Sequence, residues 1–74
     1  MTNMLTTQDK AAIIASHQKN ISYNQYNIQI NLIEENAKSN PNQDVINSYT
    51  LQLADMQKQL DALDAEIASL PKDN

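Results

Sequence analysis

The sequence predicts an all-α fold: an antiparallel two-helix hairpin of the coiled-coil type, assembled into a larger helical bundle. Three observations predict it. The 74-residue chain has no Gly and only two Pro residues. Its one turn cluster lies almost at the midpoint, and its second half carries an unbroken heptad pattern of apolar residues. We expect one domain over 1–74, with helices at about 7–38 and 41–70, a turn at 38–41 and a short polar tail at 71–74.

The first helix is expected to begin after Thr6, which can cap it, with Asp9 three residues further on. No Gly or Pro interrupts the stretch from there to Lys38. One segment, 26–32, also alternates apolar and amide residues, which is a strand pattern. A lone strand needs a pairing partner, and the sequence contains no second alternating run. The helical interpretation is therefore favoured, and the strand stays as the alternative.

The turn and the second helix have clearer signals. Asn40 as N-cap, Pro41 at the first helical position and Gln43 two residues later form a recognisable helix start. Pro71 is expected to end this helix near Leu70. A connection of about four residues makes the two helices antiparallel neighbours.

The second helix carries the strongest pattern in the sequence. Its large apolar residues follow one another at alternating steps of three and four, as in an unbroken heptad repeat. A strict seven-residue period indicates packing along a partner helix. These residues are Ile46, Tyr49, Leu53, Met56, Leu60, Leu63, Ile67 and Leu70.

The first helix offers a matching line of residues, which we call the tyrosine stripe: Tyr23, Tyr26, Ile30 and Ile33. Folding about Asn40 pairs residues whose numbers add up to about 79, which places Tyr26 near Leu53 and Ile30 near Tyr49. The sequence therefore predicts that the tyrosine stripe forms the internal seam of the hairpin. The match weakens away from the turn, where Lys19 would meet Leu60.

A second line of residues, the isoleucine stripe, lies on the same helix about 150° around its axis from the tyrosine stripe. Two nearly opposed stripes cannot both face one partner, so this stripe is predicted to contact another chain. Gln18 and Gln25 within it are either buried amides that fix register and oligomer number or solvated groups at its edge. The stripe consists of Ile14, Gln18, Ile21, Gln25, Ile28 and Leu32.

Association follows from the small size of the core. Chains of this length usually need disulfides, a metal or oligomerisation to gain more than ~3–5 kcal/mol of stability. The chain has no Cys, and its single His leaves almost no metal site. We therefore expect a protein partner or self-association, with a homo-oligomer favoured.

Composition excludes several other partners. The net charge is −4 and the chain has no Arg, so nucleic acid is not an expected partner. No apolar run approaches the ~20 residues of a membrane span, and membrane insertion is not expected. The N-terminal residues lack the pattern of a secretory signal, which indicates a cytoplasmic protein or a part of an assembled particle.

No catalytic, cofactor-binding or metal-binding residue is predicted. His17 is the only conventional general base near neutral pH, and a rod offers it no obvious pocket. Asp61 and Asp64 share a helix face but supply too few oxygens for Ca²⁺ or Mg²⁺. The three Tyr residues are interpreted as core filling, because base stacking would need basic residues between them.

The predicted function is that of a non-enzymatic structural protein that oligomerises or docks within a larger assembly, such as a viral particle or a secretion-type complex. The alternative is a small assembly chaperone or adaptor that binds a partner's amphipathic helix. The size and the turn at Ser39-Asn40-Pro41 are similar to those of small secretion-needle subunits and their chaperones. Needle subunits end in an apolar segment, whereas this chain ends in Pro71-Lys72-Asp73-Asn74, so no residue role is carried over.

Overall fold

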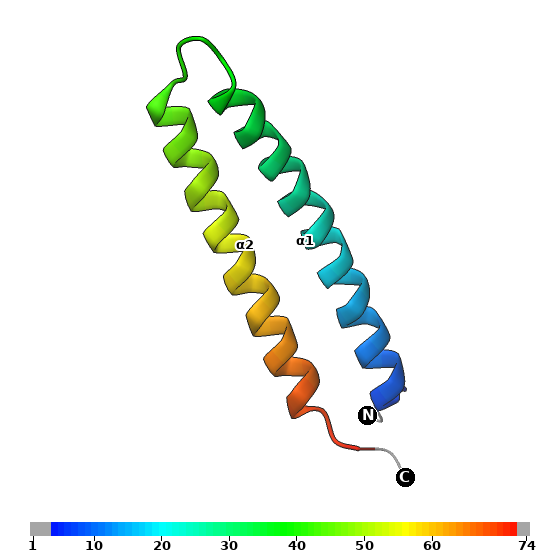
Figure 1. Ribbon diagram of the computed structural model, residues 1–74. Coiled ribbons are helices and arrows are strands. Elements are labelled where there is room, and N and C mark those ends of the chain that lie inside the picture. The colour runs from blue at the N-terminus through cyan, green and yellow to red at the C-terminus, as the bar shows by residue number, and fades with distance from the viewer. Residues whose placement is uncertain (1–3, 73–74) are drawn as a thin grey trace.

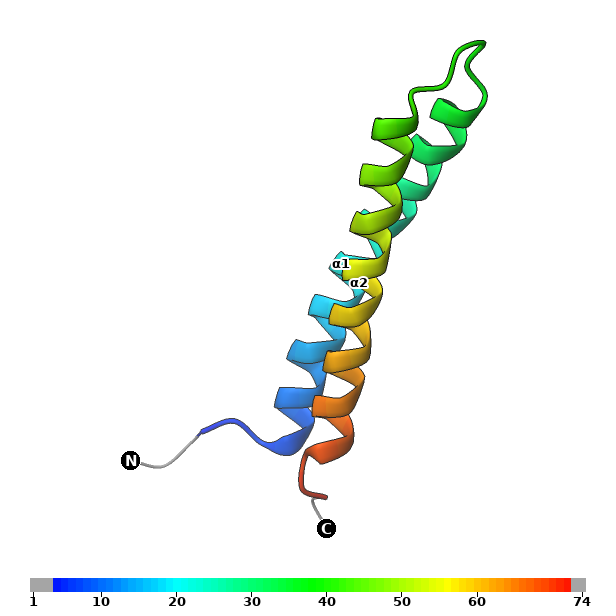
Figure 2. The same ribbon diagram turned by 90° about the vertical axis from the view of Figure 1, so that its left-hand side faces the viewer.

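The computed structural model describes residues 4–72 and contains two long helices, α1 (Thr7–Asn36) and α2 (Gln43–Ser69), joined by residues 37–42. The helices lie antiparallel and side by side, so Thr7 and Ser69 lie at the same end of a rod of 58 × 22 × 15 Å (Figures 1 and 2). The predicted all-α hairpin is confirmed. Residues 26–32 are helical, which rules out the strand alternative. Of the predicted tail, residues 73 and 74 lie outside the described residues.

α1 begins at the predicted cap. The Thr6 hydroxyl accepts a hydrogen bond from the backbone N–H of Asp9 at 3.0 Å, and the Asp9 carboxylate accepts one from the backbone N–H of Thr6 at 3.1 Å. Two donors that the first turn leaves without a helical partner are thus satisfied reciprocally. Asp9 also places a negative charge at the positive end of the helix dipole.

α1 ends two residues before the predicted boundary at Lys38. The backbone N–H of Lys38 bonds to the carbonyl of Glu35, three residues back, which tightens the last turn. The Asn36 side chain donates to the carbonyl of Leu32 at 3.0 Å. The end of α1 is therefore closed by local polar contacts, without a residue in the left-handed conformation among residues 4–72.

α2 begins later than predicted, because Asn42 and not Asn40 is its N-cap. The Asn42 side-chain oxygen accepts hydrogen bonds from the backbone N–H groups of Asp44 and Val45, at 3.0 and 3.4 Å. Pro41 accordingly precedes the cap instead of occupying the first helical position. At the other end, Leu70 is extended before Pro71, as a residue that precedes proline prefers.

The face that α1 turns toward α2 differs from the predicted one. Tyr23, Tyr26 and Ile33 are 63%, 64% and 62% exposed, so the tyrosine stripe does not form the internal seam. The isoleucine stripe is half-buried along its whole length, as are all eight apolar heptad residues of α2. The predicted assignment of the two faces of α1 is therefore wrong, and the faces are exchanged.

Two hydrogen bonds between the helices fix their register. The Gln18 amide donates to the Asp64 carboxylate at 2.7 Å, and the Gln25 amide donates to the Gln57 side-chain oxygen at 3.2 Å. The residue numbers of each pair add up to 82, not to the predicted 79. Continued along the hairpin, this register brings Ile21 level with Asp61, next to Leu60, and so against α2 and not against another chain.

The residues far from the turn explain why the isoleucine stripe, and not the tyrosine stripe, faces α2. The tyrosine stripe continues toward the N-terminus as Lys19 and Ser16, which would have placed an ammonium group against Leu60. Burying an unpaired charge is costly. The isoleucine stripe instead supplies an Ile in three successive heptads, at Ile14, Ile21 and Ile28, and so matches α2 over its full length.

The hairpin encloses no core of its own. No apolar side chain among residues 4–72 is fully buried, and Glu35 is the one buried residue of that range. The chain exposes 5829 Å². A globular monomer of 8.3 kDa is expected to expose about 4,600 Å². The rod thus leaves roughly 1,200 Å² more surface in water than a compact chain of its mass.

The substitution Ile21→Asp tests the observed face of α1. It places a carboxylate at a half-buried position against α2, where loss of the apolar contact and an unpaired charge are both unfavourable and the stability is marginal. We expect loss of most of the helical circular dichroism at 25 °C. Asn24→Asp, three residues along the same helix at an exposed position, should retain it. Equal helicity and equal melting temperatures in the two variants would show that Ile21 does not face α2.

Candidate interaction surfaces

The outer face of α1, turned away from α2, carries a second heptad pattern. It contains the tyrosine stripe and extends it in both directions at steps of four and three. At 100° per residue it lies opposite the isoleucine stripe. All of its residues are exposed except Ile30, which is half-buried. This outer stripe consists of Ala12, Ser16, Lys19, Tyr23, Tyr26, Ile30, Ile33 and Ala37.

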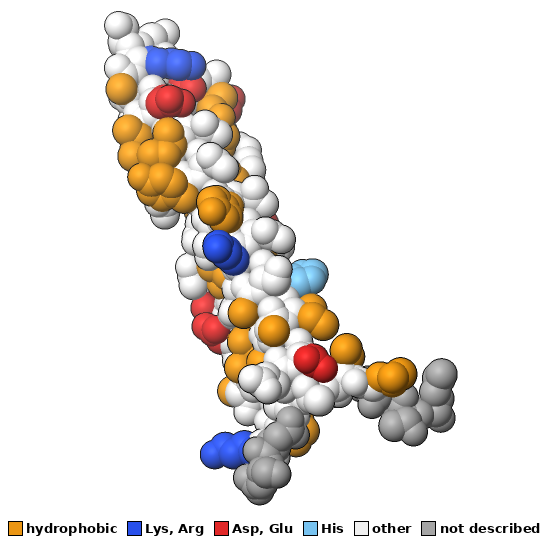
Figure 3. All heavy atoms as spheres, turned by 90° about the vertical axis from the view of Figure 1, so that its right-hand side faces the viewer, with side chains coloured by type: hydrophobic (Ala, Val, Ile, Leu, Met, Phe, Trp, Pro, Cys, Tyr) orange, Lys and Arg blue, Asp and Glu red, His pale blue; other side chains and the backbone are white. Residues whose placement is uncertain are grey.

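The apolar part of the outer stripe lies toward the turn. Figure 3 looks onto the α1 side of the rod, and hydrophobic side chains gather there in the half nearer the turn. Ile30 lies between Tyr26 and Ile33 on this face, four residues after the one and three before the other. These side chains together form an apolar surface that α2 does not cover.

A shallow hollow lies within the outer stripe. It is lined by Lys19, Ser22, Tyr23 and Tyr26. Their spacing of i, i+3, i+4 and i+7 is that of the four residues that form the hole for one knob residue in a coiled coil. A second open pocket, lined by six residues, lies at the end of the rod away from the turn. Its lining residues are Leu5, Lys10, Ile13, Ile14, Glu66 and Leu70.

The stripe predicted to bind a partner, that is the isoleucine stripe, is occupied within the hairpin. Its two amides, Gln18 and Gln25, reach across to α2, and Gln57 in turn donates to the Asp61 carboxylate at 3.1 Å. Both Gln side chains are half-buried and their bonds lie at the exposed edge. The two amides thus fix the register of α1 relative to α2 within one chain.

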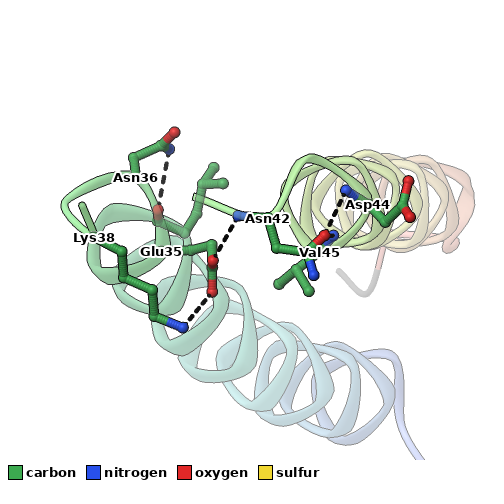
Figure 4. A network of polar contacts seen from close by, with 7 residues as sticks. Glu35, Asn36, Lys38, Asn42, Asp44 and Val45 are labelled. Carbon is green, nitrogen blue, oxygen red and sulfur yellow. Dashed lines mark hydrogen bonds and ion pairs between the residues drawn. The ribbon is translucent and has the colours of Figure 1, made fainter. Parts of the chain in front are cut away.

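Glu35 is the residue that the sequence reasoning missed. One carboxylate oxygen accepts the backbone N–H of Asn42 at 2.9 Å, and the other accepts the Lys38 ammonium at 2.9 Å (Figure 4). The side chain retains only 9% of its exposure. Its position was visible in the sequence, because Glu35 follows Leu32 by three residues and so continues the isoleucine stripe.

The electrostatics of this turn follow from those two contacts. The hydrogen bond from the Asn42 backbone, and secondly the bond from Lys38, lower the pKa of Glu35 below its usual 4.5. The carboxylate in turn raises the pKa of Lys38 above 10.5. Glu35 therefore ties the last turn of α1 to the cap of α2 in its charged form.

The residues considered for chemistry are dispersed. Within residues 4–72 no three His, Cys, Asp or Glu side chains are grouped so that they could hold a metal ion. His17 is exposed on α1, while Asp61 and Asp64 accept hydrogen bonds from glutamine amides. Over the same residues, neither helix has the length and apolar character needed to cross a membrane.

Comparison with known proteins adds no assignment. The chain matches no protein-family model, no curated protein and no solved structure. The role of the interaction surfaces therefore has to be inferred from the exposure, spacing and charge of their residues.

Replacing Gln18 and Gln25 by Leu should stabilise the hairpin. Each change puts an apolar side chain on the isoleucine stripe, and Asp64 and Gln57 lie at exposed positions where water can replace the lost bonds. We expect about 0.5–2 kcal/mol per site, measured by urea unfolding. Gln59→Leu, at an exposed position of α2, is the matched control and should change the stability little. A loss of stability in the two stripe variants would mean that the amide bonds stabilise the hairpin more than apolar packing does.

Acid should weaken the turn through Glu35. Its pKa is lowered in the folded chain, so its contribution is present above about 4.5 and is lost as the pH falls through the folded-state pKa. Glu35→Gln keeps an acceptor for Asn42 but removes the charge that pairs with Lys38. The melting temperature of the wild type should exceed that of Glu35→Gln at pH 7, and the difference should shrink as the pH falls below 4.5 and vanish once Glu35 is protonated in the folded chain.

Asp55→Asn is the control for this titration, because Asp55 is exposed on α2 and lies away from the turn. Melting curves by circular dichroism between pH 3 and pH 7 give the comparison. A difference between wild type and Glu35→Gln that does not change with pH would contradict a role for the Glu35 charge.

Proposed function

We propose that the chain is a non-enzymatic structural subunit, held in a larger helical assembly by coiled-coil packing of the outer face of α1. One observation carries the proposal: the described residues bury no apolar side chain completely, yet Tyr23, Tyr26 and Ile33 lie largely exposed on one face. Contiguous exposed apolar surface of this kind marks interaction sites.

The energetics support association. Fully burying a large apolar side chain is worth about 1.5–3 kcal/mol. Three side chains that are each nearly two-thirds exposed therefore offer roughly 3–6 kcal/mol, before ordering costs. That is comparable with the ~3–5 kcal/mol that a core of this size supplies. Before the costs of ordering and association, covering the outer stripe thus offers a gain on the scale of the hairpin's own stability.

The shape supports the same role. A rod of 58 × 22 × 15 Å presents long, narrow faces that suit side-by-side packing of helices. A viral particle or a secretion-type complex would use such a rod as a repeated part. In the alternative role of an assembly chaperone or adaptor, the outer stripe would instead bind the amphipathic helix of another protein.

The variant Tyr26→Asp tests the proposal. Tyr26 is 64% exposed in the hairpin, so the change should spare the hairpin contacts and remove association. We expect the wild type to sediment as more than one chain, with a mass that rises with concentration, and Tyr26→Asp to sediment as one helical chain. Stability should fall only because folding is linked to assembly.

Leu51→Asp is the matched control, because Leu51 is 68% exposed on α2. It should leave the sedimentation of the wild type unchanged. A wild-type chain that stays a folded monomer at every concentration would contradict the structural role and leave the chaperone as the surviving alternative.

A further inference from the structure

We propose that the outer stripe binds the outer stripe of a second copy of this chain, antiparallel, about a two-fold axis that passes between Tyr23 and Tyr26. This inference rests on the proposed function and gives it a partner. It places α1 in the middle of a four-helix layer, with its own α2 on one face and the α1 of the second copy on the other.

The first argument is the symmetry of the stripe. Read from either end, its steps are four, three, four, three, four, three and four. A second copy running in the opposite direction therefore meets every position of the stripe with another position of the stripe, and the numbers of each pair add up to 49. The pairs are Tyr23 with Tyr26, Lys19 with Ile30, Ser16 with Ile33, and Ala12 with Ala37.

The second argument is the hollow at the centre of the stripe. Its lining residues, Lys19, Ser22, Tyr23 and Tyr26, have the spacing of a hole that receives one side chain of a facing helix. In the antiparallel register Tyr26 of the second copy lies level with Tyr23 and so stands over this hollow. The two-fold axis repeats the contact, and four tyrosine rings meet at the centre, where aromatic pairs add to the gain from burial.

The third argument concerns direction. A parallel pair in register would place Lys19 directly against Lys19 of the second copy, with two ammonium groups in an apolar contact. The antiparallel pair places Lys19 beside Ile30, and Glu34 lies one turn further along the same helix. Lys19 can then bury its methylene stem and direct its charge to Glu34 of the second copy, twice in each dimer.

The residues that flank the stripe permit close approach. In the antiparallel register Asn20 lies beside Asn27, and Ser22 lies beside Gln29. No like charges meet at these four positions. Amide and hydroxyl groups at the edges of a helix pair can bond to each other or to water.

The fourth argument is area. A stable interface of standard size buries about 800 Å² on each partner. The accessible surface of a globular monomer scales with its mass, and the rod exposes roughly 1,200 Å² more than this scaling gives for a chain of its mass. The excess surface of the whole rod is therefore larger than what one interface of standard size would cover on each copy.

A charge exchange tests the contact between Lys19 and Glu34. Lys19→Glu would place a second carboxylate against Glu34, twice in each dimer, and should weaken self-association roughly tenfold, measured by sedimentation equilibrium. Glu34→Lys should weaken it similarly. The double variant Lys19→Glu with Glu34→Lys should restore it to near the wild-type value. Lys58→Glu on α2 makes the same change in net charge at an exposed site and should have little effect.

Cross-linking tests the direction. The natural chain has no Cys, so single Cys variants give unambiguous products. Ser16→Cys and Ile33→Cys chains of different length, when mixed and treated with a short thiol cross-linker, should give the mixed dimer. Neither variant alone should give a dimer, because each Cys lies far from its own copy in the antiparallel pair. Cross-linking of Ser16→Cys with itself would show a parallel pair and overturn the inference.

Failure of this inference and failure of the proposed function give different results. Self-association that Tyr26→Asp removes but Lys19→Glu leaves unchanged, with Ser16→Cys cross-linking to itself, would keep the outer face as the interface and overturn only the antiparallel second-copy contact. An assembly that persists unchanged in Tyr26→Asp would place the interface elsewhere and overturn the proposed function as well. A wild-type chain that is monomeric throughout, and that none of these variants changes, would overturn both.

Discussion

Two helices lying side by side cannot enclose a core, and this geometric constraint governs the rest of the molecule. Each helix can turn only one face toward the other, and the residues on that face remain accessible from both edges. The half-buried state of Ile21, and of every apolar heptad residue of α2, follows directly. The chain has no Cys that could add a disulfide, and packing of the outer stripe against a further chain is the additional stabilisation that we propose.

The two faces of α1 divide the tasks that a larger domain would combine in one core. The isoleucine stripe packs against α2, and its polar members specify geometry: Gln18 and Gln25 set the level of the two helices, and Glu35 joins the end of α1 to Asn42. The outer stripe has no such contacts across the hairpin and keeps its aromatic residues exposed. The polar residues that fix the register and the turn thus lie on the inner face of α1, while its aromatic side chains lie on the outer face.

Much of the fold could be predicted from the sequence because its signals are local. The cap formed by Thr6 and Asp9 and the break at Pro71 depend on neighbouring residues alone. The face of α1 could not be assigned this way, because both stripes have heptad spacing and the tyrosines are the larger side chains. The choice depended on contacts far apart in the chain, such as Gln18 with Asp64. The cap of α2 was misplaced for a similar reason, since Glu35 holds the backbone of Asn42 from seven residues away.

The contact between Glu35 and Asn42 also has a consequence for the chain entropy lost when the hairpin closes. It closes a loop of only a few residues, so little chain entropy is lost before the first contact between the helices forms. Each further pair along the rod then adds to a structure already held at one end, up to Gln18 and Asp64, which are 46 positions apart in the sequence. Loop-closure entropy thus favours closure of the hairpin from the turn toward its two ends, where the pairs are most distant in the sequence.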